Sequence, residues 1–426
     1  MSKSKKYDLL YWGILLLYRS LFYLSLTPYK LYADSQGYIE FPFKTFFLTS
    51  EAINGRTFLY PLIIRILFFI FGEKSYLTAV VILQIIVSFI SIIFLKKTVE
   101  LFIDNHFLVK LIVGLYAVNS TIMGWDKSIL TESFALSFLV ITFYFTLLYL
   151  KTSHAKFGIY SIFWAFISIF QRPTSLLYFI IISIFFVLYQ TIKKIWTKKM
   201  AFCLTISWGL LIGYCLFFQS KFEIFSVTDA IPRQQLIIVM ENEYYKSSSN
   251  TEFINMIDEQ LEEKEYNTWA AMWEVLGYFG NSNIQKLTNE CIKLNMNDYL
   301  LNRLDLMIAD SQNDYISGYI DYKDANHTSG LSKVQFLLDQ SFRIFDVGSA
   351  FIFSLLSGMF VILLWIKKKD IPWVGLGLFS SSLGTVLVSY VGTCAEYPRT
   401  MICVVPIIYI GISWWIGGCK SLEKSN

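Results

Sequence analysis

Apolar runs of roughly bilayer-spanning length recur along the chain and alternate with short polar connections. A helix that crosses the hydrocarbon core needs about 20 predominantly apolar residues, or somewhat fewer where the bilayer thins. About ten segments meet this requirement, which predicts an all-α polytopic membrane protein. The predicted spans are 8–27, 76–95, 107–123, 133–150, 157–171, 173–190, 200–219, 343–366, 371–391 and 400–418.

Basic residues in the connections indicate the orientation, because short cytoplasmic loops collect Lys and Arg. All the basic groups fall on one side if both termini are cytoplasmic. We therefore predict a multi-pass protein of the plasma membrane whose large loop, 220–342, is extracytoplasmic. The basic groups lie at the N-terminus, Lys96, Lys97, Lys151, Lys156, Lys193, Lys194, Lys198, Lys199, Lys367, Lys368, Lys369, Lys420 and Lys424.

One further apolar segment, 57–71, is shorter than a span and carries Arg65. As a helix its roughly 15 residues would be about 22 Å long. Counting it as a span would move every later basic loop to the outside. We therefore expect a juxtamembrane helix that lies on the outer leaflet.

Composition agrees with a membrane body and adds one soluble domain. The chain is 55% hydrophobic and 16% charged, whereas soluble domains are about a quarter charged. The net charge of +4 conceals a segregation, because 221–342 holds 19 acidic and 9 basic residues, a local net of −10. We predict an N-terminal transmembrane module (1–219), an acidic and mainly helical extracytoplasmic domain (220–342) and a C-terminal transmembrane module (343–426).

Reactive side chains gather in the predicted outer loops, near the ends of spans. The chain has no Walker A or Rossmann glycine pattern, and nucleotide sugars are not normally available outside the cell. An outer-face enzyme needs a donor that is already activated and already in the membrane, such as a lipid-linked phosphosugar. The protein would then supply a base for the acceptor hydroxyl and cations for the departing phosphate. The candidates are Asp34, Arg56, Asp126, Glu132, Arg172, Glu396 and Arg399.

Five short motifs occur in order on this predicted face. They are Asp34 with Tyr38, the run Asn54-Gly55-Arg56-Thr57-Phe58-Leu59-Tyr60-Pro61-Leu62, Leu130-Thr131-Glu132-Ser133, Gln171-Arg172-Pro173 and Glu396-Tyr397-Pro398-Arg399. The set resembles the GT-C superfamily of polyprenyl-phosphate-dependent glycosyltransferases. The resemblance covers the first 175 residues or so and the last 35 or so, but not the acidic domain.

The resemblance implies an inverting glycosyltransferase of cell-envelope polysaccharide biosynthesis, with Asp34 as catalytic base and 57–71 as a juxtamembrane helix. Its partners would be a polyprenyl-phosphate sugar donor, a glycan or other hydroxyl acceptor and the lipid bilayer, and no nucleic acid. Some members use a second carboxylate and a divalent metal; Glu40 and Glu51 lie nearby but fit no clear metal motif, so metal dependence stays open. Arg56, Arg172 and Arg399 are candidates for binding the donor phosphate, and Glu132 and Glu396 for the second carboxylate.

Each residue also has a simpler interpretation. Asp34 could cap a helix, Arg172 and Arg399 could anchor span ends by snorkelling, and Glu132 could meet a helix dipole. Asp126 could pair with its neighbour Lys127, and Arg19, costly inside a span, has no partner that the sequence identifies.

Two other functions also fit the pattern. A membrane polysaccharide polymerase or ligase uses lipid-linked donors and outer-loop arginines. A flippase or transporter places its polar residues near the midplane of the bilayer instead.

Overall fold

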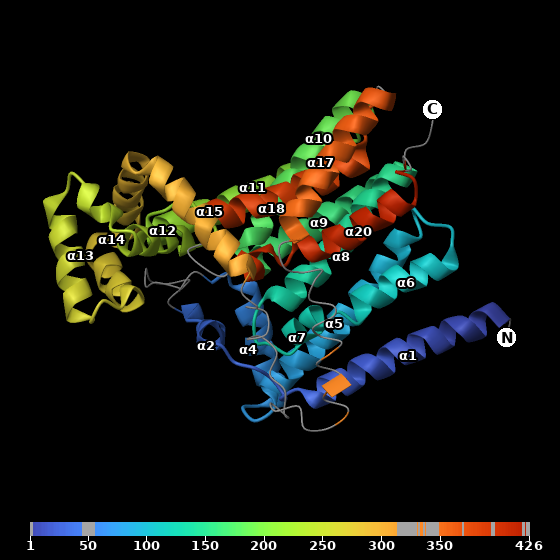
Figure 1. The fold of residues 1–426 in the computed structure, drawn as a ribbon, viewed down its shortest axis with the longest axis horizontal. Helices are drawn as coiled ribbons and strands as arrows, with labels where there is room; N and C mark the ends of the chain where they lie inside the picture. Colours follow the sequence, from blue (N-terminus) through green and yellow to red (C-terminus); the bar gives the residue numbers. More distant parts are fainter. Residues whose placement is uncertain are drawn as a thin grey trace.

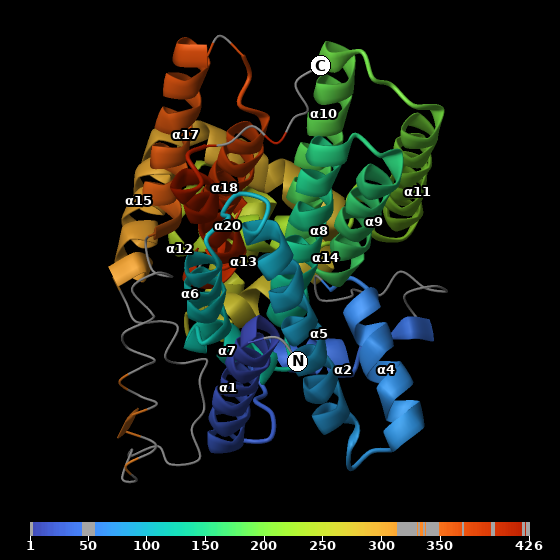
Figure 2. The same cartoon turned by 90° about the vertical axis from the view of Figure 1, so that its right-hand side faces the viewer.

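The computed structural model describes residues 3–44, 56–312, 330, 333–334, 337, 349–368, 370–392, 397–419 and 422. Within these residues the chain is all-helical and forms no strand, apart from isolated bridges such as the one between Lys30 and Ser128. Figures 1 and 2 show a bundle of helices with a group of shorter helices at one end.

The N-terminal half holds eleven labelled elements. They are α1 (Lys3–Ser25), α2 (Ala33–Ile39), α4 (Leu59–Phe71), α5 (Tyr76–Val99), α6 (His106–Ala117), α7 (Ser120–Asp126), α8 (Glu132–Thr152), α9 (Ala155–Gln171), η1 (Pro173–Ser175), α10 (Leu176–Lys193) and α11 (Lys198–Phe222).

The remaining elements divide into an extra-bundle group and the returning helices. The group comprises α12 (Ala230–Glu241), η2 (Tyr244–Ser247), α13 (Thr251–Glu263), α14 (Thr268–Leu294) and α15 (Met296–Gln312). The chain then returns to the bundle as α17 (Ser349–Lys368), α18 (Trp373–Gly392), α19 (Tyr397–Met401) and α20 (Val404–Ile416).

Within the described ranges, six helices are long and apolar enough to cross a membrane, as expected of a multi-pass membrane protein. The pair α6 and α7 would make a seventh span, although it is bent by 49°. Helices α4, α9 and α20 are apolar but shorter. The six are α5, α8, η1 with α10, α11, α17 and α18.

The predicted span 107–123 is not one continuous helix, which corrects the sequence prediction. Helix α6 ends at Ala117, and α7 starts after Asn119. The side chain of Asn119 accepts hydrogen bonds from the backbone N–H groups of Thr121 (3.0 Å) and Ile122 (3.3 Å). An asparagine that caps a new helix in this way ends the preceding one, and hydropathy alone does not detect it.

Helix α8 is the central helix of the bundle and is buried over most of its length. It packs against α5 and α9, and Figure 2 shows it between them. By contrast, α11 and α17 leave most of their residues exposed, as helices at a lipid boundary do. The first residue of the central helix, Glu132, is therefore held in a fixed position.

The extra-bundle group has an apolar core of its own. Buried residues of α12, α13 and α14, such as Leu236, Ile257 and Val275, pack together there. Helix α14 is kinked at Gly280, whose φ of 74° favours glycine. The described part of the predicted insert is thus mainly helical, with an interior separate from that of the bundle.

Candidate active site

Five charged side chains from distant parts of the chain converge at one end of the bundle. Asp34 lies in α2, Arg56 precedes α4, Glu132 begins α8, Arg172 separates α9 from η1, and Arg399 lies in α19. Ion pairs join all five into one cluster. We refer to these five residues as the charged cluster.

The two oxygens of the Asp34 carboxylate accept hydrogen bonds from different arginines. Oδ1 is 2.5 Å from Nη2 of Arg56, and Oδ2 is 2.9 Å from Nη1 of Arg399. The Asp34 side chain is 37% exposed, more than any other member of the cluster. Asp34 is therefore the carboxylate that a substrate can reach from solvent.

Glu132 occupies the opposite, buried side of the cluster. Its Oε1 accepts a hydrogen bond from Nε of Arg399 at 2.6 Å and lies 2.8 Å from Nη1 of Arg172. The Glu132 side chain has no exposed surface. Among the described residues, Oε2 of Glu132 has no hydrogen-bond partner. Arg399 thus links an exposed carboxylate to a buried one.

The charges of the cluster do not balance. Three guanidinium groups face two carboxylates, which leaves one net positive charge (3 − 2 = +1). In a partly buried site, such an excess favours an anion. A phosphate group is the anion that planar guanidinium groups recognise best, through pairs of parallel hydrogen bonds.

Proline places Arg172 in the cluster. Pro173 disfavours helical backbone at the preceding residue, and Arg172 is accordingly extended (φ −145°, ψ 120°) at the end of α9. Next to it, the buried Gln171 donates from Nε2 to the carbonyl of Thr131 at 2.6 Å. This bond fixes the end of α9 against the start of α8, where Glu132 lies.

The loop before α2 is fixed by backbone pairing. The N–H of Lys30 donates to the carbonyl of Lys127 (2.9 Å), and the N–H of Ile129 donates to the carbonyl of Lys30 (3.0 Å). The segment that carries Asp34 is therefore attached to the turn that precedes Glu132.

Arg56 is oriented by an aromatic ring. Its guanidinium carbon lies 4.6 Å from the ring centroid of Tyr38, a cation–π contact. Gly37 lets the arginine approach, because a Cβ at this position would lie 3.2 Å from Nε of Arg56. The ring of Tyr38 in turn meets the buried Tyr60 edge-on at 5.2 Å.

The electrostatic environment keeps Asp34 ionised. Burial by itself would raise the pKa of the Asp34 carboxyl, but Arg56 and Arg399 together outweigh burial and hold that pKa below its ordinary value of 3.8. Within the free protein Asp34 is thus a weak base, because its charge is already neutralised by two partners.

The structure brings together five of the candidate residues, Asp34, Arg56, Glu132, Arg172 and Arg399, whereas Asp126 lies outside this cluster. Asp34 lies in the first turn of α2 and is not its N-cap, a position that Tyr32 occupies. Glu396 and Glu51 lie outside the described residues, and Glu40 is exposed and bonded to Gln36. In the described ranges, no three His, Cys, Asp or Glu side chains form a metal-binding group.

Asp126 pairs with Arg19 instead of with its neighbour. The Nη2 of Arg19 lies 2.7 Å from Oδ2 of Asp126, both side chains are buried, and the hydroxyls of Tyr23 and Ser133 also donate to the carboxylate. This pair therefore explains how the predicted first span tolerates an arginine.

A second ion pair, which the sequence analysis did not identify, lies near the cluster. Asp229 and Arg233 pair at 2.7 Å at the start of α12, and both side chains are almost fully buried. Arg56 and Asp34 both act electrostatically on Arg233, so this pair lies within electrostatic reach of the cluster. The signal available in the sequence was an acid and a base four positions apart just after an apolar segment.

A small cavity adjoins the cluster. It lies between α10, α18 and the chain that leads into α20, next to Arg172, whose Nε donates to Oγ1 of Thr174 at 3.0 Å. Its lining includes both hydroxyl-bearing and aliphatic side chains. It is lined by Thr174, Leu177, Tyr178, Thr385, Val388, Ser389, Thr400 and Cys403.

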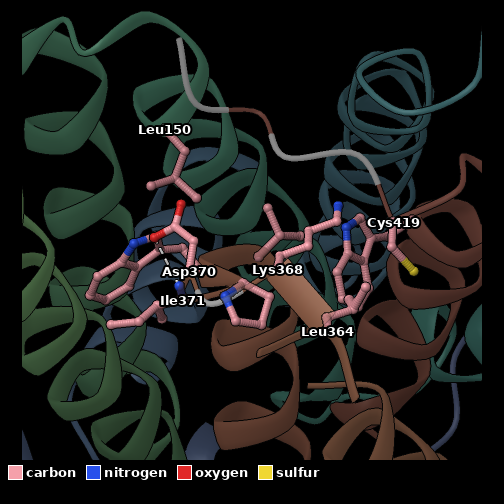
Figure 3. A pocket seen from close by; sticks show the side chains of 10 residues that line it. Leu150, Leu364, Lys368, Asp370, Ile371 and Cys419 are labelled. Atoms are coloured by element: carbon pink, nitrogen blue, oxygen red, sulfur yellow. Dashed lines mark hydrogen bonds between the residues drawn. The ribbon is translucent and has the colours of Figure 1, made fainter. Parts of the chain in front are cut away.

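A larger cavity lies at the opposite end of the bundle (Figure 3). Its lining includes Leu150, Lys368, Asp370 and Cys419. Leu150 is 18 positions beyond Glu132 on α8 (150 − 132 = 18), or about 27 Å along the helix. This cavity therefore belongs to the lysine-rich end and not to the charged cluster.

Comparison with known proteins identifies no relative: no family model matches the sequence, and no curated protein matches it either. The function of the protein therefore has to be inferred from the charged cluster and from the chemistry that it can perform.

Proposed function

We propose that the protein is an inverting glycosyltransferase that moves a sugar from a polyprenyl-phosphate donor to a hydroxyl acceptor at the outer face of the plasma membrane. The observation that carries the proposal is the arrangement of the charged cluster. One partly exposed carboxylate shares Arg399 with a buried carboxylate, and arginines are in excess. The resemblance to GT-C enzymes is independent support, because it selected the same residues by motif.

The proposal gives each charged residue a task. The phosphate of the donor binds at Arg56, Arg172 and Arg399, and Asp34 receives the acceptor hydroxyl. Glu132 holds Arg172 and Arg399 in place from the buried side. Such a division is consistent with exposure, since Asp34 is accessible and Glu132 is not.

Donor binding would also activate the base. A phosphate competes with Asp34 for Arg56 and Arg399, the two groups that lower the pKa of Asp34. When the arginines turn to the phosphate, Asp34 becomes a stronger base at the moment when the donor is present. The exchange also discourages proton abstraction when no donor is bound.

The reaction is a single displacement at the anomeric carbon. The acceptor oxygen forms a bond to that carbon from the face opposite the phosphate, and the bond from carbon to the phosphate oxygen breaks. The electron pair leaves with polyprenyl phosphate, whose charge the arginines stabilise. The proton of the acceptor hydroxyl passes to Asp34, so the products are the glycosylated acceptor and polyprenyl phosphate.

The cavity beside Arg172 has room for no more than a water-sized group, so a donor would have to part the helices that line it. Its lining includes the hydroxyl groups of Thr174 and Thr400, which could donate hydrogen bonds to a phosphate. The cavity lies between α10 and α18, two of the helices that are long enough to span the membrane. A lipid-linked donor would then reach the arginines from the side, within the bilayer.

The proposal includes the finer topology. The ten predicted spans include α1, α9 and α20 in addition to the six long helices and the bent pair, and α4 lies on the outer leaflet. Both termini are cytoplasmic, and the domain that includes α12–α15 is extracytoplasmic. In support, the lysines at the ends of α5, α8, α10 and α17 lie at the helix ends remote from the charged cluster.

The substitution Asp34→Asn tests the proposal. We expect it to abolish transfer and leave membrane expression intact, because the amide keeps the shape of the carboxylate but cannot accept the proton. Mass spectrometry of envelope glycans and lipid-linked sugars in a deletion strain carrying the variant should show missing product and accumulated donor.

Asp8→Asn is the matched control. Asp8 also forms a salt bridge, with Lys110 at 2.6 Å, but on α1 and away from the cluster. Near-normal product from Asp34→Asn would refute the assignment. Loss of chain length instead of loss of a single sugar would indicate a polymerase.

A further inference from the structure

Two exposed tryptophans lie on α14, in the group of helices outside the bundle. Trp269 and Trp273 are 51% and 40% exposed. They are four positions apart on α14, so they share one face of the helix. We refer to Trp269 and Trp273 as the tryptophan pair.

Arg233 connects the tryptophan pair to the cluster. The guanidinium carbon of Arg233 lies 5.1 Å from the ring centroid of Trp273, and the charges of Asp34 and Arg56 both act on Arg233. Arg233 itself is held in place by the buried Asp229. Trp273 is therefore connected through Arg233 to the pair of Asp34 and Arg56.

An acceptor must place one hydroxyl at Asp34 and the rest of its bulk beyond it. Because Glu132, Arg172 and Arg399 are buried, the remaining sugar rings have to extend over the exposed side of Asp34. A pyranose ring presents a face of C–H groups that packs well on an indole ring, while its hydroxyls remain free for polar groups and water. Two tryptophans one helical turn apart can hold neighbouring sugar rings of a chain.

We propose that the tryptophan pair binds the acceptor, and that the acceptor is a neutral glycan of pyranose rings. The inference rests on the proposed function and adds the substrate class and the surface that holds it. Neutrality follows from charge, because 221–342 has a local net charge of −10, which repels an acidic polymer. Arg233 then donates hydrogen bonds to hydroxyls of the ring stacked on Trp273.

Binding can be measured without catalysis. Neutral oligosaccharides released by mild acid from the envelope of a strain lacking the protein are the probe, since that envelope retains the unmodified acceptor. Saturation-transfer NMR with the full chain in nanodiscs should show contact with the sugar C–H protons. We expect Trp273→Ala, and more strongly the Trp269→Ala/Trp273→Ala double variant, to weaken binding about tenfold or more.

Three control variants separate the possible causes. Trp365→Ala removes a tryptophan that is 59% exposed on α17, and binding should not change. Trp273→Phe keeps an aromatic ring and should retain part of the binding, which shows that the fold is intact. Asp34→Asn should lose transfer activity but keep the part of the binding that the tryptophans provide.

The outcomes distinguish this inference from the proposed function. Equal binding by the wild type and the double variant overturns the inference, and so does an absence of binding to the wild type. If Asp34→Asn retains transfer, the proposed function fails whatever the tryptophans do. If Asp34→Asn loses transfer and the double variant keeps a normal KM for the acceptor, only the acceptor site is wrong.

Discussion

At the scale of single residues, Asp34 and Glu132 are two carboxylates that share one arginine in different surroundings. Arg399 contacts both, but Asp34 is 37% exposed and Glu132 has no exposed side-chain surface. A buried carboxylate is stable only while its cations are in place, whereas an exposed one can exchange partners with a ligand. Their substitutions should therefore have different effects.

Asp34 should give a characteristic pH dependence. In the free enzyme its pKa lies below 3.8, so kcat/KM should not fall on its account until the pH drops below that value. With the donor phosphate bound, the arginines are shared and the pKa rises, so the acid limb of kcat should lie at higher pH. Rates measured from pH 4 to 8 at low and at saturating donor concentration check this. Coincident acid limbs would contradict the exchange of partners.

The same pKa affects stability. Folding lowers the pKa of Asp34, so the ionised carboxylate stabilises the folded state above about pH 3.8. This stabilisation is lost as the pH falls through the lower pKa that Asp34 has in the folded protein. Asp34→Asn removes this contribution.

Glu132→Gln should reduce stability rather than only activity. The change leaves Arg172 and Arg399 without their shared buried counter-charge, and breaking such a buried pair costs about 3 kcal/mol or more. Thermal unfolding in detergent, monitored by circular dichroism, should show a clearly lower midpoint. Glu100→Gln is the control, because Glu100 pairs with Lys96 on the surface and such pairs contribute about 1 kcal/mol at most. Equal midpoints for the two variants would argue against a structural role for Glu132.

The site residues could be predicted individually, but their contacts could not. Asp34, Arg172 and Arg399 were recognisable because short polar motifs interrupt apolar runs at the predicted outer face. The shared contact at Glu132 joins residues 267 positions apart, and hydropathy carries no information on such pairing. Trp273 and Arg233 were missed for the same reason, since each is unremarkable in its own helix.

At the scale of helices, one fully buried ion pair links α1 to α7. Apart from the pair between Arg19 and Asp126, α1 leaves many apolar side chains exposed, among them Leu9 and Leu17. The prediction of an all-helical fold with apolar helices of membrane-spanning length is confirmed for six helices of the described residues, but the prediction joined α6 and α7. A cap at Asn119 decides that break, and a window of hydropathy averages over it.

Arg19→Met should destabilise the protein more than Arg19→Met combined with Asp126→Asn. The single change leaves the buried Asp126 carboxylate without its cation, at a cost of about 3 kcal/mol in the free energy of unfolding. The double change also removes the negative charge of Asp126 and keeps an oxygen that accepts hydrogen bonds from Tyr23 and Ser133. Unfolding midpoints of the two variants and the wild type are the measurement. If the double variant is no more stable than the single one, the pair is not what holds α1.

At the scale of the whole molecule, charge separates two ends. The lysines lie at one end of the bundle with the cavity of Figure 3, and the charged cluster lies at the other. Six described helices that are long and apolar enough to cross a membrane run between these two ends, so the two ends are expected to lie on opposite sides of a bilayer. The orientation, with the cluster outside, is open to direct measurement.

Cysteine labelling tests the orientation. In a variant without the native cysteines, Lys246→Cys before α13 should react with a membrane-impermeant maleimide in intact cells. Lys198→Cys at the start of α11 should react only after permeabilisation. Both lysines are exposed, so access to the reagent and not burial decides the result. The reverse pattern would place the charged cluster in the cytoplasm.

The long sequence separation between Asp34 and Arg399 has a consequence for biosynthesis. These residues are 365 positions apart, and Arg399 follows all but one of the bundle helices. During synthesis from the N-terminus, both carboxylates enter the membrane long before the arginine that joins them. A chain that stalls before α19 holds Glu132 with one cation fewer, and we expect such a chain to be less stable. The charged cluster is therefore complete only when synthesis of the chain is nearly complete.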